Sequence, residues 1–335
     1  MNYSDFRKEQ ENFQLAWRER QNISKDYGYQ NRKQYPHIVP RREWTKTIWQ
    51  PLEKDLIEYI KKEDIHSHTG THNLLSSWVL CSNLYFGTIC NDNFRELFRQ
   101  FLEKKLETKI EQITKIDLEF AFDDELSPKE LLGEKDGKKG SGQTSPDLAI
   151  LYSTNGKKGV ILVECKYTEK SFYNCSGRKA NPSSGLVSNP NPKKCKDNET
   201  MTSLKNNCHL YVWERKYWEH LSISEYGLEK LNFCPAYLGG YQLVRQQALA
   251  EGITKSGKFK DVVSCVAYDA RNEKLMQCMK GNNINSIVLE WAKLFKGKSK
   301  FSVWEHQDWV DYVRGNCNEK FGKAWIKYIE DRYKM

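Results

Sequence analysis

Two apolar segments separated by a tight turn constrain the fold of this chain more than any other part of its sequence. Residues 147–153 read DLAILYS and residues 159–169 read GVILVECKYTE, with TNGKK between them. A continuous apolar run such as VILV is typical of a strand that is covered on both faces. Asn-Gly is a preferred pair for the turn of a hairpin. The sequence therefore predicts a hairpin inside a covered sheet.

Three ionisable residues lie at one end of this predicted hairpin. Asp147 begins the first strand, and Glu164 and Lys166 lie near the end of the second. Side chains alternate along a strand, so Glu164 and Lys166 project to one face and Cys165 projects to the other. Neighbouring strands lie roughly 4.7–4.9 Å apart, so antiparallel pairing brings Asp147 close to both charges. Buried charges are costly unless they are paired or bound to a metal, and we expect these three to form one site.

Two carboxylates and an ammonium are the groups that hydrolysis of a phosphodiester requires. Mg²⁺ prefers oxygen ligands and commonly takes one or two carboxylates plus substrate phosphate, so Asp147 and Glu164 are the predicted ligands of Mg²⁺ or Mn²⁺. Such a metal activates water and polarises the phosphate. Lys166 is expected to orient or help deprotonate the water and to offset charge on phosphorus. Glu-x-Lys alone is common at exposed strand edges, and the apolar context is what favours a catalytic site.

These residues resemble the signature of the PD-(D/E)xK nuclease superfamily, which has the restriction-endonuclease-like fold. The matching residues are Pro146-Asp147, then sixteen residues, then Glu164-Cys165-Lys166. The order of the predicted elements is also similar to the core of that superfamily. The resemblance implies that Asp147 and Glu164 bind the metal and that Lys166 assists the attacking water.

The resemblance also suggests residues outside this motif. Many members use a Glu on the helix before the first strand, for which Glu96 is the candidate and Glu103 the alternative. Some recombination-type members carry a Gln-x-x-x-Tyr helix after the core motif. Here Gln242 and Arg245 share a helical face, and Gln246 replaces the Tyr. We expect Gln242 and Arg245 to contact the active site or a phosphate, although a solvated helix face has the same pattern.

Local patterns predict the elements around the hairpin. Apolar spacing predicts a helix over about 4–22, a second helix that Pro51 opens, and a third that Thr71 caps. Alternating residues predict further strands at 115–123 and 262–269. The resulting order is typical of an α/β fold with a restriction-endonuclease-like core, in which helices flank a central mixed β-sheet.

The chain is expected to consist of a core with two extensions. We predict a helical N-terminal extension over 1–70, a nuclease core over 71–280 and a helical C-terminal extension over 281–335. Residues 171–200 are rich in Pro, Asn, Ser and Gly and have no periodicity, which predicts an insertion in the core.

The charge of the chain favours a polyanionic partner. The formal net charge is +9, and nucleic acid is the obvious partner for a basic protein, although a Lys-rich surface also serves solubility. Arg178 and Lys179 in the insertion are the predicted ligands of DNA phosphates.

Four cysteines in and after the insertion predict a second metal site. Four thiolates can hold a structural Zn²⁺, and His209 is an alternative fourth ligand. The long, irregular spacings also fit separate reduced cysteines. The four candidates are Cys175, Cys195, Cys208 and Cys234.

Together these features predict a metal-dependent deoxyribonuclease. The sequence has no apolar run of 18 or more residues and no apolar segment of a secretory signal, so we expect a cytoplasmic protein without a membrane partner. The resemblance implies a role in restriction or anti-phage defence. Alternatives are a repair or recombination nuclease on structured or single-stranded DNA, an RNase, and a non-catalytic nucleic-acid-binding protein. Double-strand cleavage by one site per chain favours a homodimer.

Overall fold

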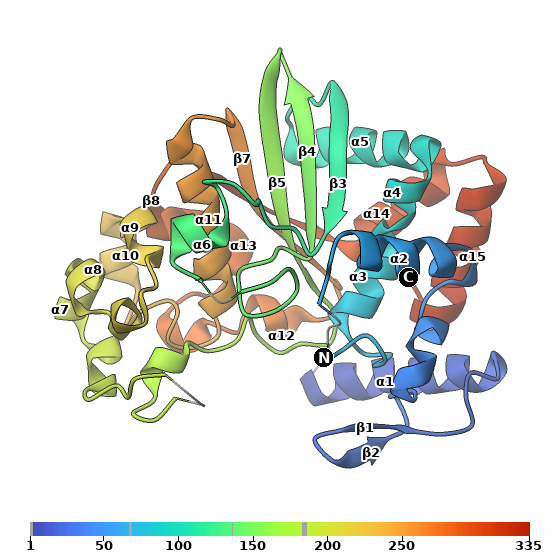
Figure 1. Cartoon of the computed structure of the whole chain (residues 1–335), viewed down its shortest axis with the longest axis horizontal. Helices are drawn as coiled ribbons and strands as arrows, with labels where there is room; N and C mark the ends of the chain where they lie inside the picture. Colours follow the sequence, from blue (N-terminus) through green and yellow to red (C-terminus); the bar gives the residue numbers. More distant parts are fainter. Residues whose placement is uncertain (1–2, 67–68, 136, 183–185) are drawn as a thin grey trace.

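A five-stranded mixed sheet forms the centre of the protein (Figure 1). This computed structural model describes residues 3–66, 69–135, 137–182 and 186–335. The strands lie in the order β3 (Gln112–Leu118), β4 (Leu148–Thr154), β5 (Lys157–Lys166), β7 (Asp261–Tyr268) and β9 (Lys300–Glu305). β3, β4 and β5 pair antiparallel, whereas β7 and β9 continue the sheet in parallel. The predicted α/β fold with a central mixed sheet is confirmed.

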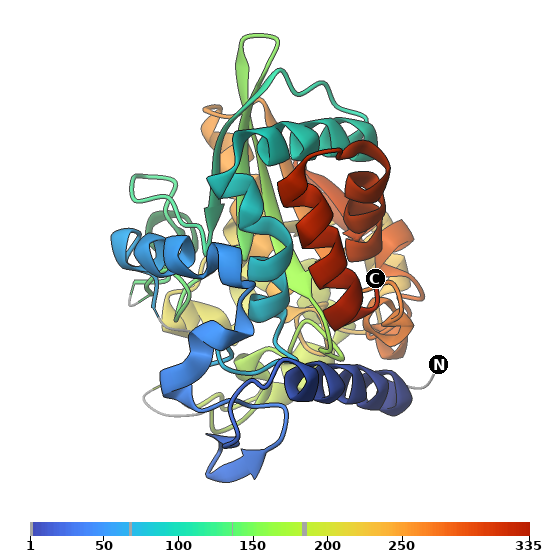
Figure 2. The same ribbon diagram turned by 90° about the vertical axis from the view of Figure 1, so that its right-hand side faces the viewer.

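Helices cover both faces of the sheet (Figures 1 and 2). One face packs against α2 (Gln50–Lys62), α3 (Ser77–Tyr85), α4 (Gly87–Cys90), α5 (Asp92–Leu106), α14 (His306–Asn316) and α15 (Lys320–Tyr333), with α1 (Tyr3–Arg20) against α15. On the other side lie α6 (Pro128–Leu132), α7 (Asn198–Thr202), α8 (Leu204–Asn207), α9 (Tyr217–His220), α10 (Glu225–Lys230), α11 (Tyr241–Ser256), α12 (Glu273–Met276) and α13 (Ile287–Glu290).

Short elements complete the described part of the chain. The two-stranded pairs are β1 (Gly28–Gln30) with β2 (Lys33–Tyr35) and β6 (Ser222–Ile223) with β8 (Phe295–Lys296). The 3₁₀ turns are η1 (Arg41–Thr47), η2 (Ser176–Arg178), η3 (Pro192–Lys196), η4 (His209–Trp213), η5 (Lys280–Asn282) and η6 (Trp291–Leu294). Among the described helices, none combines the length and apolar character needed to cross a membrane.

Strand β5 contributes side chains to two separate hydrophobic cores. Ile161, Val163 and Cys165 enter the core on the α3 side, and Val160 and Leu162 enter the core on the α11 side. All five are fully buried. The prediction of a strand that is covered on both faces is therefore confirmed.

The hairpin has the predicted turn. Thr154 pairs with Lys157, and Asn155 and Gly156 between them have φ angles of 48° and 70°. A type I′ turn needs positive φ at both central residues, which Asn-Gly adopts most readily. At the other end of the hairpin Leu148 pairs with Val163.

Two predicted boundaries are corrected. The strand expected at 115–123 is β3, which ends at Leu118 because Glu119 has a φ angle of 49°. The helix expected to begin at Thr71 is α3, whose N-cap is Ser76. Ser76 accepts a hydrogen bond from the backbone N–H of Trp78, as N-cap residues do.

The C-terminal segment is also corrected. Residues 281–335 were expected to form a helical extension, but they include β9, which pairs with β7 over Val263–Tyr268. Helices α14 and α15 that follow β9 pack in the same core as α3 and α5. This segment is therefore part of the central fold.

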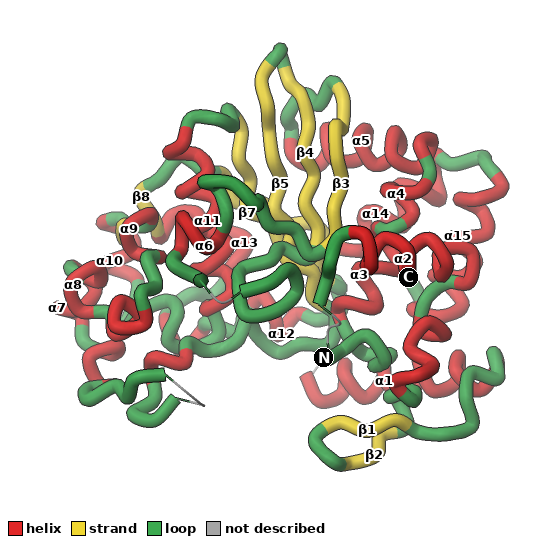
Figure 3. Tube along the Cα trace, in the orientation of Figure 1, coloured by secondary structure: helices red, strands yellow, loops and turns green. Residues whose placement is uncertain are grey.

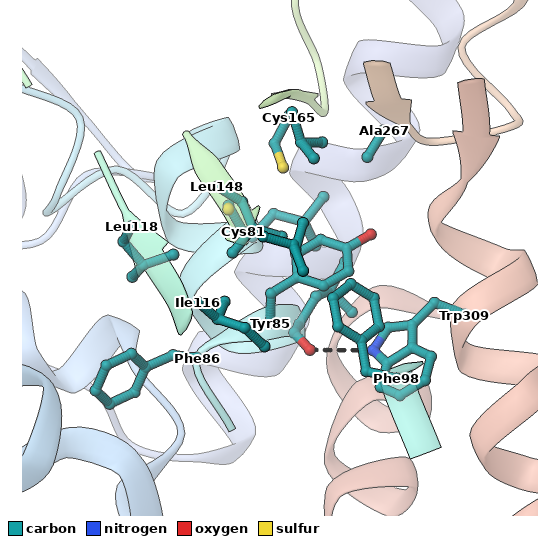
Figure 4. Close-up of a cluster of buried hydrophobic side chains, with 14 of the residues drawn as sticks. Cys81, Tyr85, Phe86, Phe98, Ile116, Leu118, Leu148, Cys165, Ala267 and Trp309 are labelled. Carbon is teal, nitrogen blue, oxygen red and sulfur yellow. Dashed lines mark hydrogen bonds between the residues drawn. The ribbon is translucent and has the colours of Figure 1, made fainter. Parts of the chain in front are cut away.

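A buried hydrogen-bond chain crosses the core on the α3 side. Figure 4 shows Tyr85 in this core, with a dashed line for the bond that its hydroxyl accepts. The hydroxyl of Tyr85 accepts from Trp304 Nε1 at 2.9 Å and bonds to His306 Nδ1 at 2.9 Å. Nε2 of His306 lies 3.1 Å from the backbone oxygen of Lys166. Because that oxygen can only accept, Nε2 carries the proton and Nδ1 accepts from Tyr85. Burial lowers the pKa of His306 to about 4, so the ring is neutral.

We predict that Tyr85→Phe lowers the free energy of unfolding by about 1–3 kcal/mol, because Trp304 Nε1 and His306 Nδ1 then lose their partner in a dry core. The measurement is chemical denaturation. The control Tyr312→Phe removes an exposed hydroxyl 3.5 Å from Gln100, and its effect should stay within about 0.5 kcal/mol. Equal losses of unfolding free energy in the two variants would show that the hydroxyl of Tyr85 contributes no more to stability than an exposed hydroxyl does.

Candidate active site

The hairpin register brings Asp147 and Glu164 together. Because Leu148 pairs with Val163, Asp147 lies opposite Glu164 at the open end of the hairpin. Oδ2 of Asp147 accepts a hydrogen bond of 2.7 Å from the backbone N–H of Cys165. The carboxylate of Asp147 is thereby held against the last residues of β5.

Lys166 lies directly beside Glu164. Its Nζ is 2.6 Å from Glu164 Oε1, and both side chains are buried. Gln242, in the first turn of α11, donates from Nε2 to the same oxygen at 2.9 Å. The structure therefore brings Asp147, Glu164, Lys166 and Gln242 together, as the sequence predicted.

Glu119 is a third carboxylate at this site, which the sequence did not reveal. It follows β3 directly, and its backbone N–H donates to the oxygen of Asp147 at 3.1 Å. Its side chain is buried. Burial raises the pKa of Glu119 well above its usual value, and the charges of Asp147 and Glu164 raise it further. The signal in the sequence was an acidic residue at the end of the strand that neighbours Asp147.

The carboxylates at this site outnumber the cations near them. Burial raises the pKa of Asp147 well above its usual value, and repulsion by Glu164 adds to the rise. Burial alone would lower the pKa of Lys166, but attraction to Glu164, Glu169 and Asp147 outweighs it and raises the pKa. Lys166 therefore stays protonated, and the carboxyl groups around it outnumber its single ammonium.

The donor set suits a hard divalent cation. Among the described residues, no group of three or more His, Cys, Asp or Glu side chains is arranged so that it could hold a metal ion. Mg²⁺ commonly needs only one or two protein carboxylates beside water and substrate oxygens, and Asp147 and Glu164 supply two. Oε1 of Gln242 is buried without a hydrogen-bond partner in the described part of the chain. A surplus of carboxyl groups over cations and an unpaired oxygen acceptor both fit a hydrated cation, whose binding would favour the ionised carboxylates.

Glu96 and Glu103 do not belong to this site, which corrects both predictions. Arg99 binds the carboxylates of both, and Glu103 Oε1 also accepts from the backbone N–H of Ile110. Ile110 precedes β3, whereas Glu119 follows it, so this cluster lies at the opposite end of the strand. Figure 1 shows α5 beside the hairpin turn, away from the end of β5.

Arg245 lines the same small cavity as Glu164 and Gln242, and its Nε is held by neighbouring side chains. Its Nε donates to Thr144 Oγ1 at 3.0 Å and lies 3.2 Å from Oε1 of the buried Glu134. Glu134 also accepts from Thr144. Arg245 lies one helical turn after Gln242 on α11, and it holds the loop that precedes Asp147 in place.

The start of the insertion lies against the candidate site. Lys166 Nζ is 5.8 Å from the ring centroid of Phe172 and 5.6 Å from that of Tyr173. Tyr173 is 57% exposed and was not predicted as a site residue. Further along, Arg178 is half-buried with its guanidinium over Tyr237, and Lys179 is exposed.

The sheet order, the covered hairpin and the clustered Asp, Glu and Lys define a restriction-endonuclease-like protein. The chain belongs to the REase-ARP family, described as "Restriction Endonuclease associating with ARP", whose family model matches residues 10–334. No curated protein and no solved structure gives a significant match. The family match confirms the resemblance and indicates a nuclease-like role.

We predict that Glu119→Gln stabilises the fold at pH 8 but not at pH 4. The folded-state pKa of Glu119 is raised, so its contribution to stability falls as the pH rises above the ordinary carboxyl pKa. The gain at pH 8 should exceed about 0.5 kcal/mol, the usual range for a substitution on the surface.

Denaturation of the parent and the variant at both pH values is the measurement. The control Glu229→Gln changes an exposed carboxylate and should shift stability by less than about 0.5 kcal/mol at either pH. A Glu119→Gln protein that is less stable than its parent at pH 8 would refute the inference that burial and neighbouring carboxylates destabilise ionised Glu119.

Proposed function

We propose that this chain is a Mg²⁺-dependent DNA endonuclease that hydrolyses phosphodiester bonds, with Asp147, Glu164 and Lys166 as its catalytic residues. The observation that carries the proposal is the clustering of buried Glu164, buried Glu119 and half-buried Asp147 around Lys166. Such crowding costs folding free energy, and perturbed carboxylates beside a charged partner are typical of functional sites. The restriction endonuclease family supports the nuclease chemistry.

Asp147 and Glu164 would hold the metal, with Glu119 beside them. When bound, Mg²⁺ supplies polarisation of the phosphate and a lowered pKa for water. Lys166 is protonated, so it acts as a hydrogen-bond donor that orients the attacking water and offsets charge on the phosphate oxygens. A raised carboxyl pKa suits Glu119 to accept a proton near neutral pH. Gln242 keeps Glu164 in place through its bond to Oε1.

DNA is the proposed substrate because the chain is basic and belongs to a restriction endonuclease family. Lys179 and the exposed face of Arg178 would contact phosphates near the site. Tyr173, exposed beside Lys166, offers a ring on which a base can stack. We propose that this activity belongs to restriction or anti-phage defence in the cytoplasm. A homodimer would supply one active site for each DNA strand.

We predict that Lys166→Met and Glu164→Gln each reduce Mg²⁺-dependent cleavage of plasmid DNA by on the order of 10²–10⁴-fold. The physical reason is loss of the ammonium in one variant and of a metal ligand in the other. The matched control is Lys158→Met, at the exposed far end of the same strand, which should retain activity.

The assay compares initial rates with Mg²⁺ and with excess chelator. Full activity of Lys166→Met would refute the proposed mechanism. Supercoiled, single-stranded and branched DNA and an RNA duplex are assayed in parallel. Cleavage confined to branched or single-stranded DNA would favour a repair nuclease, and cleavage of RNA alone an RNase. Binding without cleavage of any substrate would favour a non-catalytic protein.

A further inference from the structure

The segment between β5 and α11 has little regular structure of its own (Figure 3). Its described helices are all short, and the longest, α10, has six residues. Short helices contribute little stability by themselves, and segments with few regular elements commonly depend on a metal or a disulfide. Packing in the core on the α11 side orders much of this segment, and a bound metal would add to that order.

Four cysteines of this segment converge on one small cavity. They come from separate places: before η2, within η3, between α8 and η4, and after α10. The residues are Cys175, Cys195, Cys208 and Cys234. All four are free thiols. The backbone joins two of these places directly, because the N–H of Cys234 donates to the oxygen of Cys195 at 3.1 Å.

We propose that Cys175, Cys195, Cys208 and Cys234 bind one structural Zn²⁺. Four thiolates around one Zn²⁺ make a closed tetrahedral site, which suits a buried structural role. The four cysteines that line the cavity make a complete ligand set, so His209, the alternative fourth ligand, is not required.

Binding requires a local change in the four side chains. Within the described residues, the thiols as they stand do not form a group that could hold a metal. Their Sγ atoms must turn toward the cavity that all four already line, which rotation about χ1 allows. Burial raises the pKa of Cys175 to about 12 and that of Cys208 to about 11, so the metal-free thiols keep their protons. Four protons therefore leave as four Zn–S bonds form.

The surroundings of the cavity carry compensating charge. A tetrathiolate zinc site has a net charge of about −2, because four thiolates bind one divalent ion. Tyr237 lines the cavity, with Arg178 at 5.6 Å and Lys196 at 5.5 Å from its ring centroid. These two cations lie where they can offset that charge.

The proposed zinc site is connected to the candidate active site through the backbone. The N–H of Cys175 donates to the oxygen of Ala236 at 2.9 Å, and the N–H of Gln242 donates to the oxygen of Phe172 at 2.9 Å. The segment that bears Cys175 thus sets the start of α11 and the position of Gln242. We infer that the zinc stabilises one wall of the nuclease site without taking part in the chemistry.

The test is the zinc content of the full chain, expressed with added Zn²⁺, purified in reductant without a metal-chelating tag and analysed by mass spectrometry. We expect one zinc per chain, released when a mercurial reagent titrates the thiols. Cys208→Ser should lose most of this zinc. Cys90→Ser, an exposed cysteine elsewhere, and Glu164→Gln should keep it, which separates this site from the acidic one.

Parent protein that stays substoichiometric after reconstitution with Zn²⁺ would overturn the proposal, whether or not the variants fold. Full zinc content in folded Cys208→Ser and Cys234→Ser proteins would do the same. Neither result bears on DNA cleavage, so the zinc proposal and the nuclease proposal fail independently.

Discussion

The contact between Lys166 and Glu164 is the interaction on which the site depends. An ammonium and a carboxylate 2.6 Å apart are buried on one face of a central strand. Removing either partner of such a pair leaves an uncompensated charge in a medium of low dielectric constant, which is strongly unfavourable. Asp147 and Glu119 add two more carboxyl groups to the same place, and crowding raises the pKa of both. The two hydrophobic cores stabilise β4 and β5, and this packing offsets the cost of burying the charged groups at their ends.

The opposite face of β5 shows how the strand end is fixed. Cys165 enters the hydrophobic core beside α3, while its backbone N–H holds Asp147. The backbone oxygen of Lys166 accepts from His306, which in turn is bonded to Tyr85. Charged side chains on one face of the strand are therefore positioned by neutral hydrogen bonds and apolar packing on the other.

The sequence was sufficient for the hairpin and for the residues it brings together. Strand alternation, the Asn-Gly turn and the apolar run are local signals, and they place Asp147, Glu164 and Lys166 without knowledge of the rest of the chain. Gln242 was identified through family resemblance together with helical spacing. These predictions succeeded because the pairing register of one hairpin determines most of the geometry.

The sequence was insufficient where distant segments decide the outcome. Glu119 became a site residue because β3 ends beside Asp147; an acidic residue at a strand end is a signal that acquires meaning only once the pairing of β3 with β4 is known. Glu96 was excluded because Arg99 binds it at the far end of β3. The six-residue strand β9 follows a stretch rich in Lys and Gly, and only its pairing with β7 identifies it. Tertiary contacts, rather than local propensity, determine each of these features.

The most direct test of the central claim is the position of a divalent cation in crystals of the protein soaked with Mn²⁺ and collected at an anomalous wavelength. The account predicts an anomalous peak in contact with the carboxylates of Asp147 and Glu164, close to Glu119. Absence of a peak there at saturating Mn²⁺, in crystals that admit the ion elsewhere, would contradict it.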